Sequence, residues 1–342
     1  MAISSYLKWA ALTLATAQLS AAQTYTSCNP LNRGITETCP ADTGLAKWEF
    51  NTDFTAGSSA FSKWNTTAGT VESTSLGAKF TISEQGDAPT IESDFYIFFG
   101  RVEVKMRAAN GTGIISTTVL ESDDLDEIDW EQISTYDYSI ETDYFGKGNT
   151  TSYDRATTVN VTTPEETFHT YTVDWTSSRI EWLLDGEVVR TLEYADALNG
   201  KNYPQTPMRI KIGIWAGGDP DNGEGTIEWA GGETDYTAGP FTMYVESVKV
   251  TNYNPASAYK YTDKTGDYTS IKATNGTTST NLASTSSSVK ASSASSSSSS
   301  KSSASSSASS SASATVSAAG SISPYSVFVT IMVAFVASAF QL

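Results

Sequence analysis

The chain has 342 residues and a formal net charge of −17, and 39% of its residues are hydrophobic. The excess of acidic residues argues against nucleic acid as a partner, because phosphate contacts require a basic surface. A single histidine and two cysteines supply few of the ligands that a zinc centre uses, so we expect no bound metal at the cysteines.

Residues 1–22 are predicted to be a secretory signal peptide. Lys8 provides the positive flank, an apolar run follows, and residues 20–22 supply the small side chains of a cleavage site. A buried helix is the alternative, which the extreme N-terminal position disfavours. We therefore expect the mature chain to begin near Gln23, and we assign residues 23–260 to one all-β domain.

Both cysteines, Cys28 and Cys39, lie near the start of that domain. In an exported protein, two cysteines and no others predict a single disulfide that closes a small loop. Asn-x-Ser/Thr sequons are consistent with passage through a glycosylating compartment and give five candidate N-glycosylation sites: Asn65, Asn110, Asn149, Asn160 and Asn275.

The stretch "LESDDLDEIDWEQISTY", residues 120–136, concentrates seven carboxylates. Because strand side chains alternate between faces, Glu127, Asp129 and Glu131 would share one face. The intervening Ile and Trp would point to the other face, where they can be buried. A loop would leave these two apolar side chains in water, so the sequence predicts a strand with an acidic front.

This acidic front is a candidate catalytic site. Like charges repel one another, which raises the pKa of at least one carboxyl, and a raised pKa suits a general acid. Retaining glycosidases use two carboxyl groups roughly 5–5.5 Å apart. Ideal strand Cα atoms four residues apart are separated by about 13 Å, so the two Glu side chains would have to converge over a curved sheet. A calcium site is the alternative, but the stretch lacks the Gly and Asn of calcium loops.

Alternation predicts further strands along the chain. In "MRIKIGIW", residues 208–215, four apolar side chains alternate with two cations, a glycine and Trp215. "GRVEVKMRA" and "FTMYVESVKV" alternate similarly, and "RIEWLLDGEVVRTLEY" predicts a hairpin with Asp185-Gly186 as its turn. The best short helical candidate is "YADALNG". Many strands with Gly-rich connections predict a β-sandwich.

Two segments follow the predicted domain. Residues 261–317 form a Ser/Thr-rich, low-complexity stalk with no apolar face to bury, as in O-glycosylated segments, and a bare flexible linker is the alternative. Residues 318–342 are predicted to be a glycosylphosphatidylinositol (GPI) attachment signal that is removed, with attachment in the region of Ala319 or Gly320. A bilayer-spanning tail anchor is the weaker alternative, because about 20 apolar residues are usually needed.

The acidic strand resembles a known signature. "DEIDWE" is similar to the E-x-D-x-E motif of glycoside hydrolase family 16, whose members have a concanavalin-like β-jelly roll. "FHTYTVDWTSSRIEWLLDGEVVR" and "PMRIKIGIWAGGDP" resemble two further regions of that family. "CNPLN…CP", "DYFGKG", "GTIEWAGG" and the Ser-rich tail resemble one branch, the Crh family of fungal cell-wall transglycosylases. The resemblance covers essentially the whole chain.

That resemblance implies a retaining double displacement. Glu127 would be the nucleophile, Glu131 the general acid and then the base, and Asp129 an auxiliary residue between them. The implied enzyme cleaves chitin and passes the fragment to β-1,3- or β-1,6-glucan, which cross-links the cell wall. The sequence departs from the family pattern at "QISTY", which follows Glu131, and at Asp143, where an amide is expected.

A sugar cleft needs exposed aromatic rings, whose faces stack on the C–H surfaces of pyranoses. Trp215 is the best candidate, Trp229 the second, and Tyr144 and Phe145 follow from the resemblance. Two cations on the predicted face of Trp215 complete the substrate-binding candidates, Arg209 and Lys211.

Other conspicuous residues are expected to have structural roles. Trp130 and Trp182 are predicted to lie in the core, and His169 to be a hydrogen-bonded strand residue near the cleft. No G-x-S-x-G elbow accompanies this histidine, which argues against a serine hydrolase. The Gly-rich stretch "WAGGDPDNGEG" is predicted to be a loop bordering the cleft, with no helix after it.

Taken together, these features predict a monomeric, GPI-anchored chitin–glucan transglycosylase of the cell wall and the outer face of the plasma membrane. We expect no cofactor, while a structural calcium ion far from the cleft stays open. A β-glucan hydrolase of the same fold is the close alternative, because the first chemical step is shared. A non-catalytic carbohydrate-binding wall protein is the alternative from another class, which would have no need to retain three repelling carboxylates.

Overall fold

The computed structural model describes residues 26–32 and 39–276, which belong to the compact unit Met1–Ser286. The second unit, Ser287–Leu342, lies outside the described residues. The predicted signal peptide, most of the predicted stalk and the attachment signal with Ala319 and Gly320 also lie outside them, so these stay predictions. Within the described residues, no helix has the length and apolar character needed to cross a membrane.

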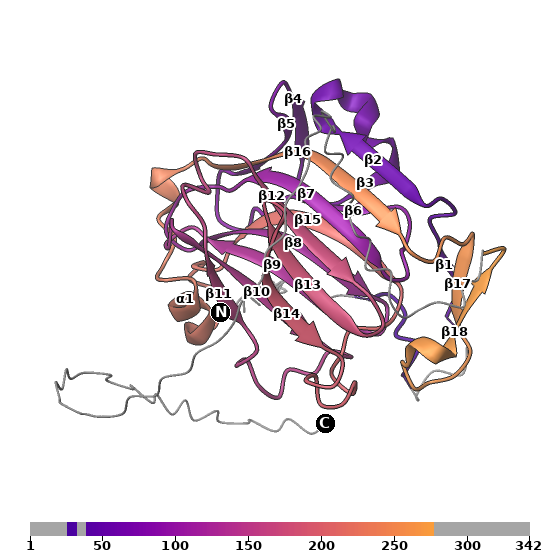
Figure 1. The fold of residues 1–342 in the computed structure, drawn as a ribbon. Coiled ribbons are helices and arrows are strands. Elements are labelled where there is room, and N and C mark those ends of the chain that lie inside the picture. Colours follow the sequence, from indigo (N-terminus) through magenta and orange to yellow (C-terminus); the bar gives the residue numbers. More distant parts are fainter. Residues whose placement is uncertain (1–25, 33–38, 277–342) are drawn as a thin grey trace, which may run out of the picture. The chain divides into compact units, whose positions relative to one another are not determined.

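One antiparallel sheet of seven strands carries the acidic stretch. Its strands run in the order β11-β10-β9-β8-β15-β6-β3, so segments far apart in the sequence are neighbours (Figure 1). Their bounds are β3 (Trp64–Ala68), β6 (Thr90–Ser93), β8 (Ile114–Ser122), β9 (Glu127–Ile133), β10 (Ser139–Phe145), β11 (Thr157–Asn160) and β15 (Met208–Ala216).

A second antiparallel sheet packs against the first. Seven of its eight strands follow the order β14-β13-β12-β7-β16-β5-β4, and β2 also pairs with β16. Their bounds are β2 (Glu49–Asp53), β4 (Val71–Thr74), β5 (Gly77–Ile82), β7 (Gly100–Arg107), β12 (His169–Trp175), β13 (Arg179–Leu184), β14 (Glu187–Glu193) and β16 (Phe241–Asn252).

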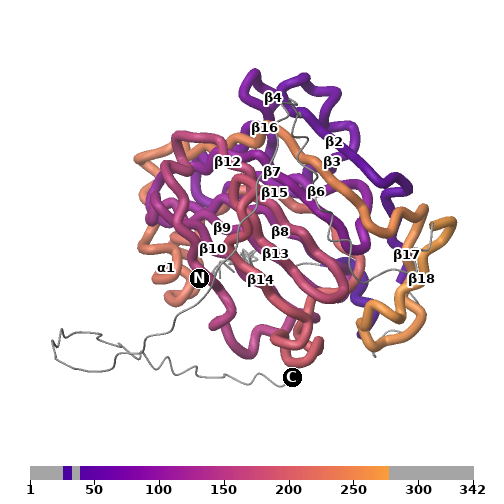
Figure 2. Tube along the Cα trace, in the orientation of Figure 1, coloured from indigo at the N-terminus to yellow at the C-terminus, as the bar shows by residue number. Residues whose placement is uncertain are grey.

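The remaining elements are short. A three-stranded sheet joins β1 (Asp42–Thr43), β17 (Ala258–Tyr261) and β18 (Ile271–Thr274), and Figures 1 and 2 show it at one end of the sandwich. One short α-helix, α1 (Glu224–Trp229), and four 3₁₀ turns complete the described fold: η1 (Phe54–Ala56), η2 (Ser58–Lys63), η3 (Tyr236–Ala238) and η4 (Tyr268–Ser270).

The two large sheets enclose one main hydrophobic core. The alternation predicted for residues 208–215 is confirmed, because Met208, Ile210, Ile212 and Ile214 are all fully buried on one face of β15. The predicted hairpin is also confirmed: β13 and β14 flank Asp185 and Gly186, both with positive φ, as the tight primed turns of hairpins require. The all-β sandwich expected from the sequence is therefore correct.

The core fixes the acidic strand from behind. Ile128 and Trp130 are fully buried in the main core, as the alternation predicts. The indole N–H of Trp130 donates to the Thr172 carbonyl in β12 (3.2 Å). In return, the indole N–H of Trp182 in β13 donates to the carbonyl of Asp129 (3.0 Å). Two buried tryptophans thus tie the backbone of β9 to the opposite sheet and limit its freedom to shift.

Three expectations need correction. "YADALNG" forms successive turns and no helix, because its helical pattern is too short to sustain propagation. A helix does follow the Gly-rich stretch, since α1 begins at Glu224. The folded domain also continues past residue 260, because β17 crosses that boundary and β18 ends at Thr274. Residues 261–276 therefore belong to the folded domain, although their Ser and Thr content resembles that of the predicted stalk.

Candidate active site

The candidate site is built on the outer face of β9. Glu127, Asp129 and Glu131, which we call the acidic row, alternate with the buried Ile128 and Trp130. The row lies on the face that points away from the main core. Glu127 is 9% exposed and Asp129 1%, while Glu131 is partly exposed.

The neighbouring strand β10 brings a second set of side chains to the same face. Directly opposite partners in an antiparallel pair share a face, and the register places Glu141 opposite Glu131, Asp143 opposite Asp129, and Phe145 opposite Glu127. Two opposite pairs of carboxyl groups are thus neighbours on this face: Asp129 with Asp143, and Glu131 with Glu141. This concentration of like charge is the main electrostatic property of the site.

The surroundings of Asp129 favour its protonated form. Burial raises the pKa of Asp129 well above its usual range, and the charges of Glu127, Glu131 and Asp143 raise it further. No N–H or O–H group among the described residues donates to either of its side-chain oxygens. A protonated Asp129 needs no donor for both of its oxygens, because its own proton can be donated in a hydrogen bond to the neighbouring Glu127.

Glu131 has the electrostatic properties of a general acid. Withdrawal from water is the largest cause of its shift, and together with the charges of Glu127, Asp143 and Glu141 it raises the pKa of Glu131 to about 8. The carboxyl therefore keeps its proton at neutral pH, where it can protonate a leaving oxygen. A pKa near the working pH also lets the same group take a proton back in a later step.

Asp143 shows how β10 contributes to this field. Burial raises the pKa of Asp143 to about 6, although the backbone N–H of Tyr144 and the charge of Arg155 oppose the increase. That N–H donates to Oδ1 of Asp143 (2.7 Å) and fixes the carboxyl next to Asp129. An amide here would remove a negative charge from beside the acidic row, so the departure from the family pattern has an electrostatic consequence.

A buried pair of aspartates precedes the acidic row in the chain. The Thr206 hydroxyl lies 2.5 Å from Oδ1 of Asp124 and 2.8 Å from Oδ2 of Asp126. Two buried carboxyls thus share one hydroxyl hydrogen, which favours a proton on one of them. Burial, followed by the charge of Asp126, accordingly raises the pKa of Asp124 to about 7. Asp126 also accepts hydrogen bonds from the backbone N–H groups of Lys147 (2.9 Å) and Gln205 (2.7 Å). The pair therefore anchors two loops at the residue before Glu127.

The residues after the acidic row, "QISTY", form a structural junction. Ser134 donates to the carbonyl of Ala109 (2.5 Å), and the Thr135 hydroxyl accepts from the N–H of Gly113 (2.9 Å) and donates to the carbonyl of Ala230 (2.7 Å). Ile133 packs in a small apolar cluster together with Trp215 and Ala230. This departure from the family pattern thus joins the end of β9 to the end of α1.

The two candidate tryptophans, Trp215 and Trp229, lie together. Trp215 is on the predicted outer face of β15, but it is less exposed than expected. Trp215 stacks on Trp229 with ring centroids 6.0 Å apart, and Trp215 is only 6% exposed. Trp229 is partly exposed, and its indole N–H donates to Oε2 of Glu141 (3.0 Å). The expectation that Trp215 presents an open ring is therefore wrong, because α1 covers it with Trp229.

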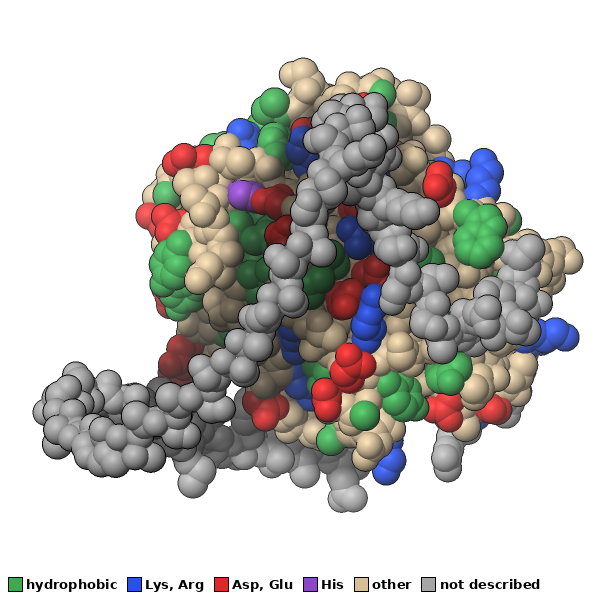
Figure 3. Space-filling view, in the orientation of Figure 1, with side chains coloured by type: hydrophobic (Ala, Val, Ile, Leu, Met, Phe, Trp, Pro, Cys, Tyr) green, Lys and Arg blue, Asp and Glu red, His purple; other side chains and the backbone are tan. Residues whose placement is uncertain are grey.

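Arg209 and Lys211 lie on the same face, further across the sheet. Arg209 forms an ion pair with Glu92 (2.5 Å), and Lys211 forms one with Glu121. Arg209 and Lys211 are thus each paired within the chain, and their remaining hydrogen-bonding capacity is what a substrate could use. Acidic and basic side chains also lie next to one another on the other face of the sandwich, which carries the single histidine on β12 and is the face viewed in Figure 3.

The two aromatic candidates of β10, Tyr144 and Phe145, lie on opposite faces of the sheet. Phe145 shares the face of the acidic row and is partly exposed, with the guanidinium of Arg155 4.6 Å from its ring centre. Tyr144 is opposite Ile128, belongs to the main core and is 6% exposed. The expectation that Tyr144 contacts substrate is therefore corrected, because strand alternation turns it toward the interior.

Sequence reasoning missed the carboxylates that surround the acidic row. Glu141, Glu121 and Glu92 all lie on its face, and none was among the candidates. For Glu141 the signal was present, because alternation in "SIETDYF" puts it with Asp143 and Phe145. No comparable signal reveals that Glu92 meets Arg209, since the pairing of β6 with β15 joins segments far apart in the sequence.

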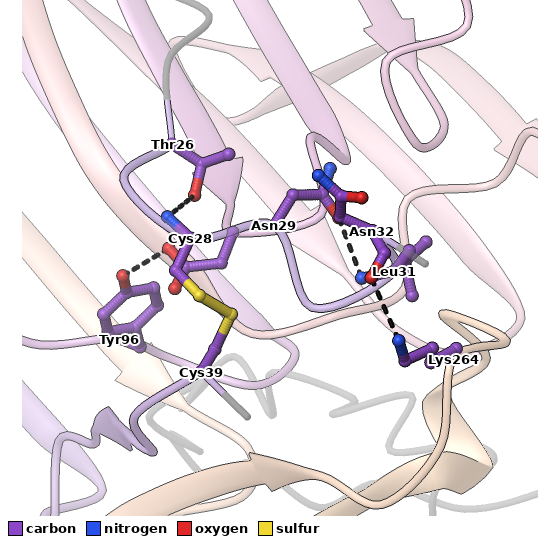
Figure 4. The surroundings of a disulfide bond; sticks show 9 residues. Thr26, Cys28, Asn29, Leu31, Asn32, Cys39, Tyr96 and Lys264 are labelled. Carbon is purple, nitrogen blue, oxygen red and sulfur yellow. Dashed lines mark hydrogen bonds between the residues drawn. A yellow bond between two sulfur atoms is a disulfide. The ribbon is translucent and has the colours of Figure 1, made fainter. Parts of the chain in front are cut away.

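The predicted disulfide joins Cys28 to Cys39, with Cα atoms 5.8 Å apart. Figure 4 shows it next to Tyr96, whose hydroxyl donates to Oδ1 of Asp123 (2.7 Å). Lys264 donates to the carbonyl of Asn32 in the same loop (3.0 Å). The loop is therefore tied to the segment between β17 and β18.

Other predicted residues lie away from the acidic row. His169 is a hydrogen-bonded strand residue, as expected, but it belongs to the second sheet and contacts Asp185 (2.7 Å). No group of three or more His, Cys, Asp or Glu side chains in the described ranges is arranged to hold a metal ion. Asn149 is the one sequon asparagine that is only partly exposed. The other four are exposed: Asn65, Asn110, Asn160 and Asn275.

Comparison with known proteins gives a consistent family. Residues 58–231 match glycosyl hydrolases family 16. The chain is 61% identical over 271 residues to Crh-like protein 1 of Aspergillus fumigatus, which covers 79% of this chain and 72% of that protein. It is 47% identical to Congo red hypersensitive protein 1 of Saccharomyces cerevisiae, over 73% of this chain and 48% of that protein.

Solved structures agree with the fold. A Crh5 transglycosylase in complex with NAG is 56% identical and superposes with a TM-score of 0.69, over 72% of this chain and 99% of that one. A β-glucanase of Bacillus licheniformis shares the fold at 23% identity and a TM-score of 0.50, over 60% of this chain and 98% of that one.

A β-sandwich with paired carboxylates on one strand defines a glycosidase-type enzyme, and the chain belongs to glycosyl hydrolases family 16. Within that family it groups with the Crh-like proteins.

Proposed function

We propose that this protein is a chitin–glucan transglycosylase that uses a retaining double displacement. The observation that carries the proposal is the acidic row, in which Glu127, Asp129 and Glu131 share one face of β9. The similarity to a Crh5 transglycosylase supports transfer to a sugar, and the NAG in that complex supports a donor built from N-acetylglucosamine. The glucan acceptor follows from the resemblance to the Crh branch.

In the first step, the Glu127 carboxylate attacks the anomeric carbon of a chitin unit. The bond from that carbon to the glycosidic oxygen breaks, and Glu131 gives its proton to the leaving oxygen. The raised pKa of Glu131 supports this assignment, because the group must be protonated at the start. The products are a covalent glycosyl-enzyme on Glu127 and a shortened chain.

In the second step, a hydroxyl group of a β-glucan chain attacks the same carbon from the side that the leaving group left. Glu131, now ionised, takes the hydroxyl proton, and the ester bond to Glu127 breaks. Two inversions at one carbon retain its configuration. The proton and the Glu127 carboxylate are both restored, so we propose that no cofactor takes part.

Asp129 serves Glu127 in this scheme. A neutral Asp129 can donate a hydrogen bond to Glu127 and compensate part of the cost of placing two further carboxyls nearby. When Glu127 becomes an ester, it loses its charge, and this hydrogen bond weakens. We therefore assign Asp129 to holding and tuning the nucleophile.

We further propose that the protein acts in the cell wall, as a monomer held at the outer face of the plasma membrane by a GPI anchor. The Crh-like relatives support the cell-wall part, and the sequence of residues 318–342 supports the anchor. Release from membranes by a phospholipase that cuts GPI lipids tests the anchor, and light scattering of the purified protein tests the monomer. Retention after that treatment would favour a protein tail anchor.

The test of the activity offers chitin oligomers with and without fluorescently labelled β-glucan oligomers. Labelled hybrid products are expected with the unmodified protein, and none with Glu127→Gln, which keeps the size of the side chain but removes the nucleophile. Shortened chitin without hybrids would instead identify a hydrolase. Unchanged sugar binding with no turnover in either protein would identify a carbohydrate-binding wall protein.

A further inference from the structure

A cavity of about 190 Å³ lies at the end of the acidic face. It is lined by the end of β9, the connection to β10, and the facing parts of β10 and β11. The lining residues that matter are Ile133, Tyr136, Tyr138, Ser139, Glu141 and Thr158. Register places Thr158 directly opposite Glu141, and Glu141 directly opposite Glu131. The cavity lining therefore includes the residue that lies directly opposite the general acid.

The lining has the chemistry of a sugar site. Tyr136 is 39% exposed and Tyr138 63%, so each offers part of its ring to a ligand. Exposed aromatic faces suit the C–H surface of a pyranose, and their hydroxyl groups remain available for hydrogen bonds. Ser139 and Thr158 add two further hydroxyl groups. A carbohydrate ring is therefore a better match than an apolar ligand.

Glu141 adds a negative charge to this cavity. Its Oε2 accepts a hydrogen bond from the indole of Trp229 (3.0 Å), which fixes the carboxyl in place. Within residues 26–32 and 39–276, no Lys or Arg forms an ion pair with it. Further across the same face, Glu92 and Glu121 are each paired with a cation of the chain. No cation of the described residues thus pairs with the Glu141 carboxylate, so a cationic ligand can pair with it.

The required ligand combines a pyranose ring with a positive charge. The acetamide N–H of an N-acetylglucosamine unit and the hydroxyl groups of a glucose unit can donate hydrogen bonds to Glu141, but neither unit neutralises its charge. A glucosamine unit carries an ammonium group on the ring. Partial removal of acetyl groups from chitin produces such units within the proposed donor polymer.

We propose that the cavity at Glu141 binds a glucosamine unit of partially deacetylated chitin, with its ammonium group at the Glu141 carboxylate and its ring against Tyr136 or Tyr138. This inference rests on the proposed function, because it names the form of chitin that the same site prefers. It makes Glu141 a specificity-determining residue for the polysaccharide.

The test measures binding in a Glu127→Gln background, in which the substrate is not consumed. Isothermal titration calorimetry would compare tetramers of glucosamine, N-acetylglucosamine and β-1,3-glucose at low and high salt. We expect the glucosamine tetramer to bind about fivefold more tightly than the acetylated one at low salt, with the advantage shrinking at high salt. Adding Glu141→Gln should remove the advantage and leave the affinity for the acetylated tetramer unchanged.

Two controls separate the cavity from the general acidity of the protein. Glu187→Gln changes an exposed carboxylate on β14 in the other sheet, and it should leave the glucosamine advantage intact. Tyr138→Ala should weaken the binding of the glucosamine and acetylated tetramers alike. Because the amide of Gln can still accept from Trp229, the melting temperature of Glu141→Gln should match its parent.

The outcomes distinguish this inference from the proposed function. Equal affinities for the glucosamine and acetylated tetramers, or an advantage that survives Glu141→Gln, would overturn the cavity assignment while hybrid products could still form. A glucosamine advantage that depends on Glu141, in a protein that yields no hybrid products, would leave the cavity standing and reject the transglycosylase.

Discussion

Glu131 and Glu141 lie directly opposite each other on two neighbouring antiparallel strands, β9 and β10. One is the proposed general acid, and the other is fixed by a hydrogen bond from Trp229. Burial is the largest cause of the raised pKa of Glu131, followed by the charges of Glu127, Asp143 and Glu141. The second strand thus supplies two of the charges that raise the pKa of a catalytic group on the first.

This arrangement predicts a shift of the pH profile in Asp143→Asn. Removing a negative charge near Glu131 makes its proton easier to lose, so the pKa of Glu131 falls from about 8. The alkaline limb of kcat/KM should therefore move to lower pH, and the pH dependence of kcat/KM for hybrid formation measures this. A limb that stays in place would show that Asp143 does not act on Glu131. Asp196→Asn, at an exposed turn, is the matched control.

The role of Glu131 predicts a selective loss in Glu131→Gln. The change removes both the acid and the base, so transfer from chitin oligomers should fall by about 10²–10⁴-fold. An aryl glycoside, whose leaving group needs no proton, should restore the first step. Azide, which needs no base to attack, should restore the second and give a glycosyl azide of retained configuration, detectable by NMR. A failure of both rescues would contradict the assignment.

The buried aspartate pair predicts that the protein loses stability as pH rises. The pKa of Asp124 is raised in the folded state to about 7 from a usual value of 3.8. Its contribution is therefore fully present below about pH 4 and is lost as the pH rises through about 7. Asp124→Asn imitates the protonated form, so its melting temperature should vary less between pH 4 and 7. Asp196→Asn should keep the dependence of the unmodified protein.

The junction after the acidic row predicts a specific loss in Thr135→Val. The shape is kept, but the N–H of Gly113 loses its acceptor and the carbonyl of Ala230 loses its donor. The free energy of unfolding should fall by about 1–3 kcal/mol, measured by urea denaturation. Thr135→Ser keeps the hydroxyl and should stay close to the unmodified protein. A loss in Thr135→Ser with none in Thr135→Val would instead assign the effect to packing of the methyl group.

The disulfide predicts a moderate effect on stability. Replacing both Cys28 and Cys39 with Ser releases a loop closed over a sequence separation of 11 residues, which should cost about 2–3 kcal/mol of unfolding free energy. Thermal denaturation of the double variant, compared with the single variants, measures the cost. Because neither cysteine belongs to a strand that carries the acidic row, hybrid formation at low temperature should continue. Its complete loss would show that the loop contributes to catalysis.

Sequence alone determined the fold class and the acidic row. The period of two in β9 and β15 separates buried from outward residues, because a strand offers no other way to bury Ile128, Trp130 and Ile212. The turn at Asp185-Gly186 follows from the same local chemistry. Such features depend on residues that are neighbours in the chain, which is why they can be read from it.

Only the tertiary structure decided what surrounds that row. The partners of Arg209 and Lys211, the covering of Trp215 by Trp229, and the cavity next to Glu141 all depend on which strands lie side by side. These pairings join segments far apart in the sequence, and a small change of register would replace every contact. Local pattern placed three carboxyls on one face, and long-range packing determined their burial and their neighbours.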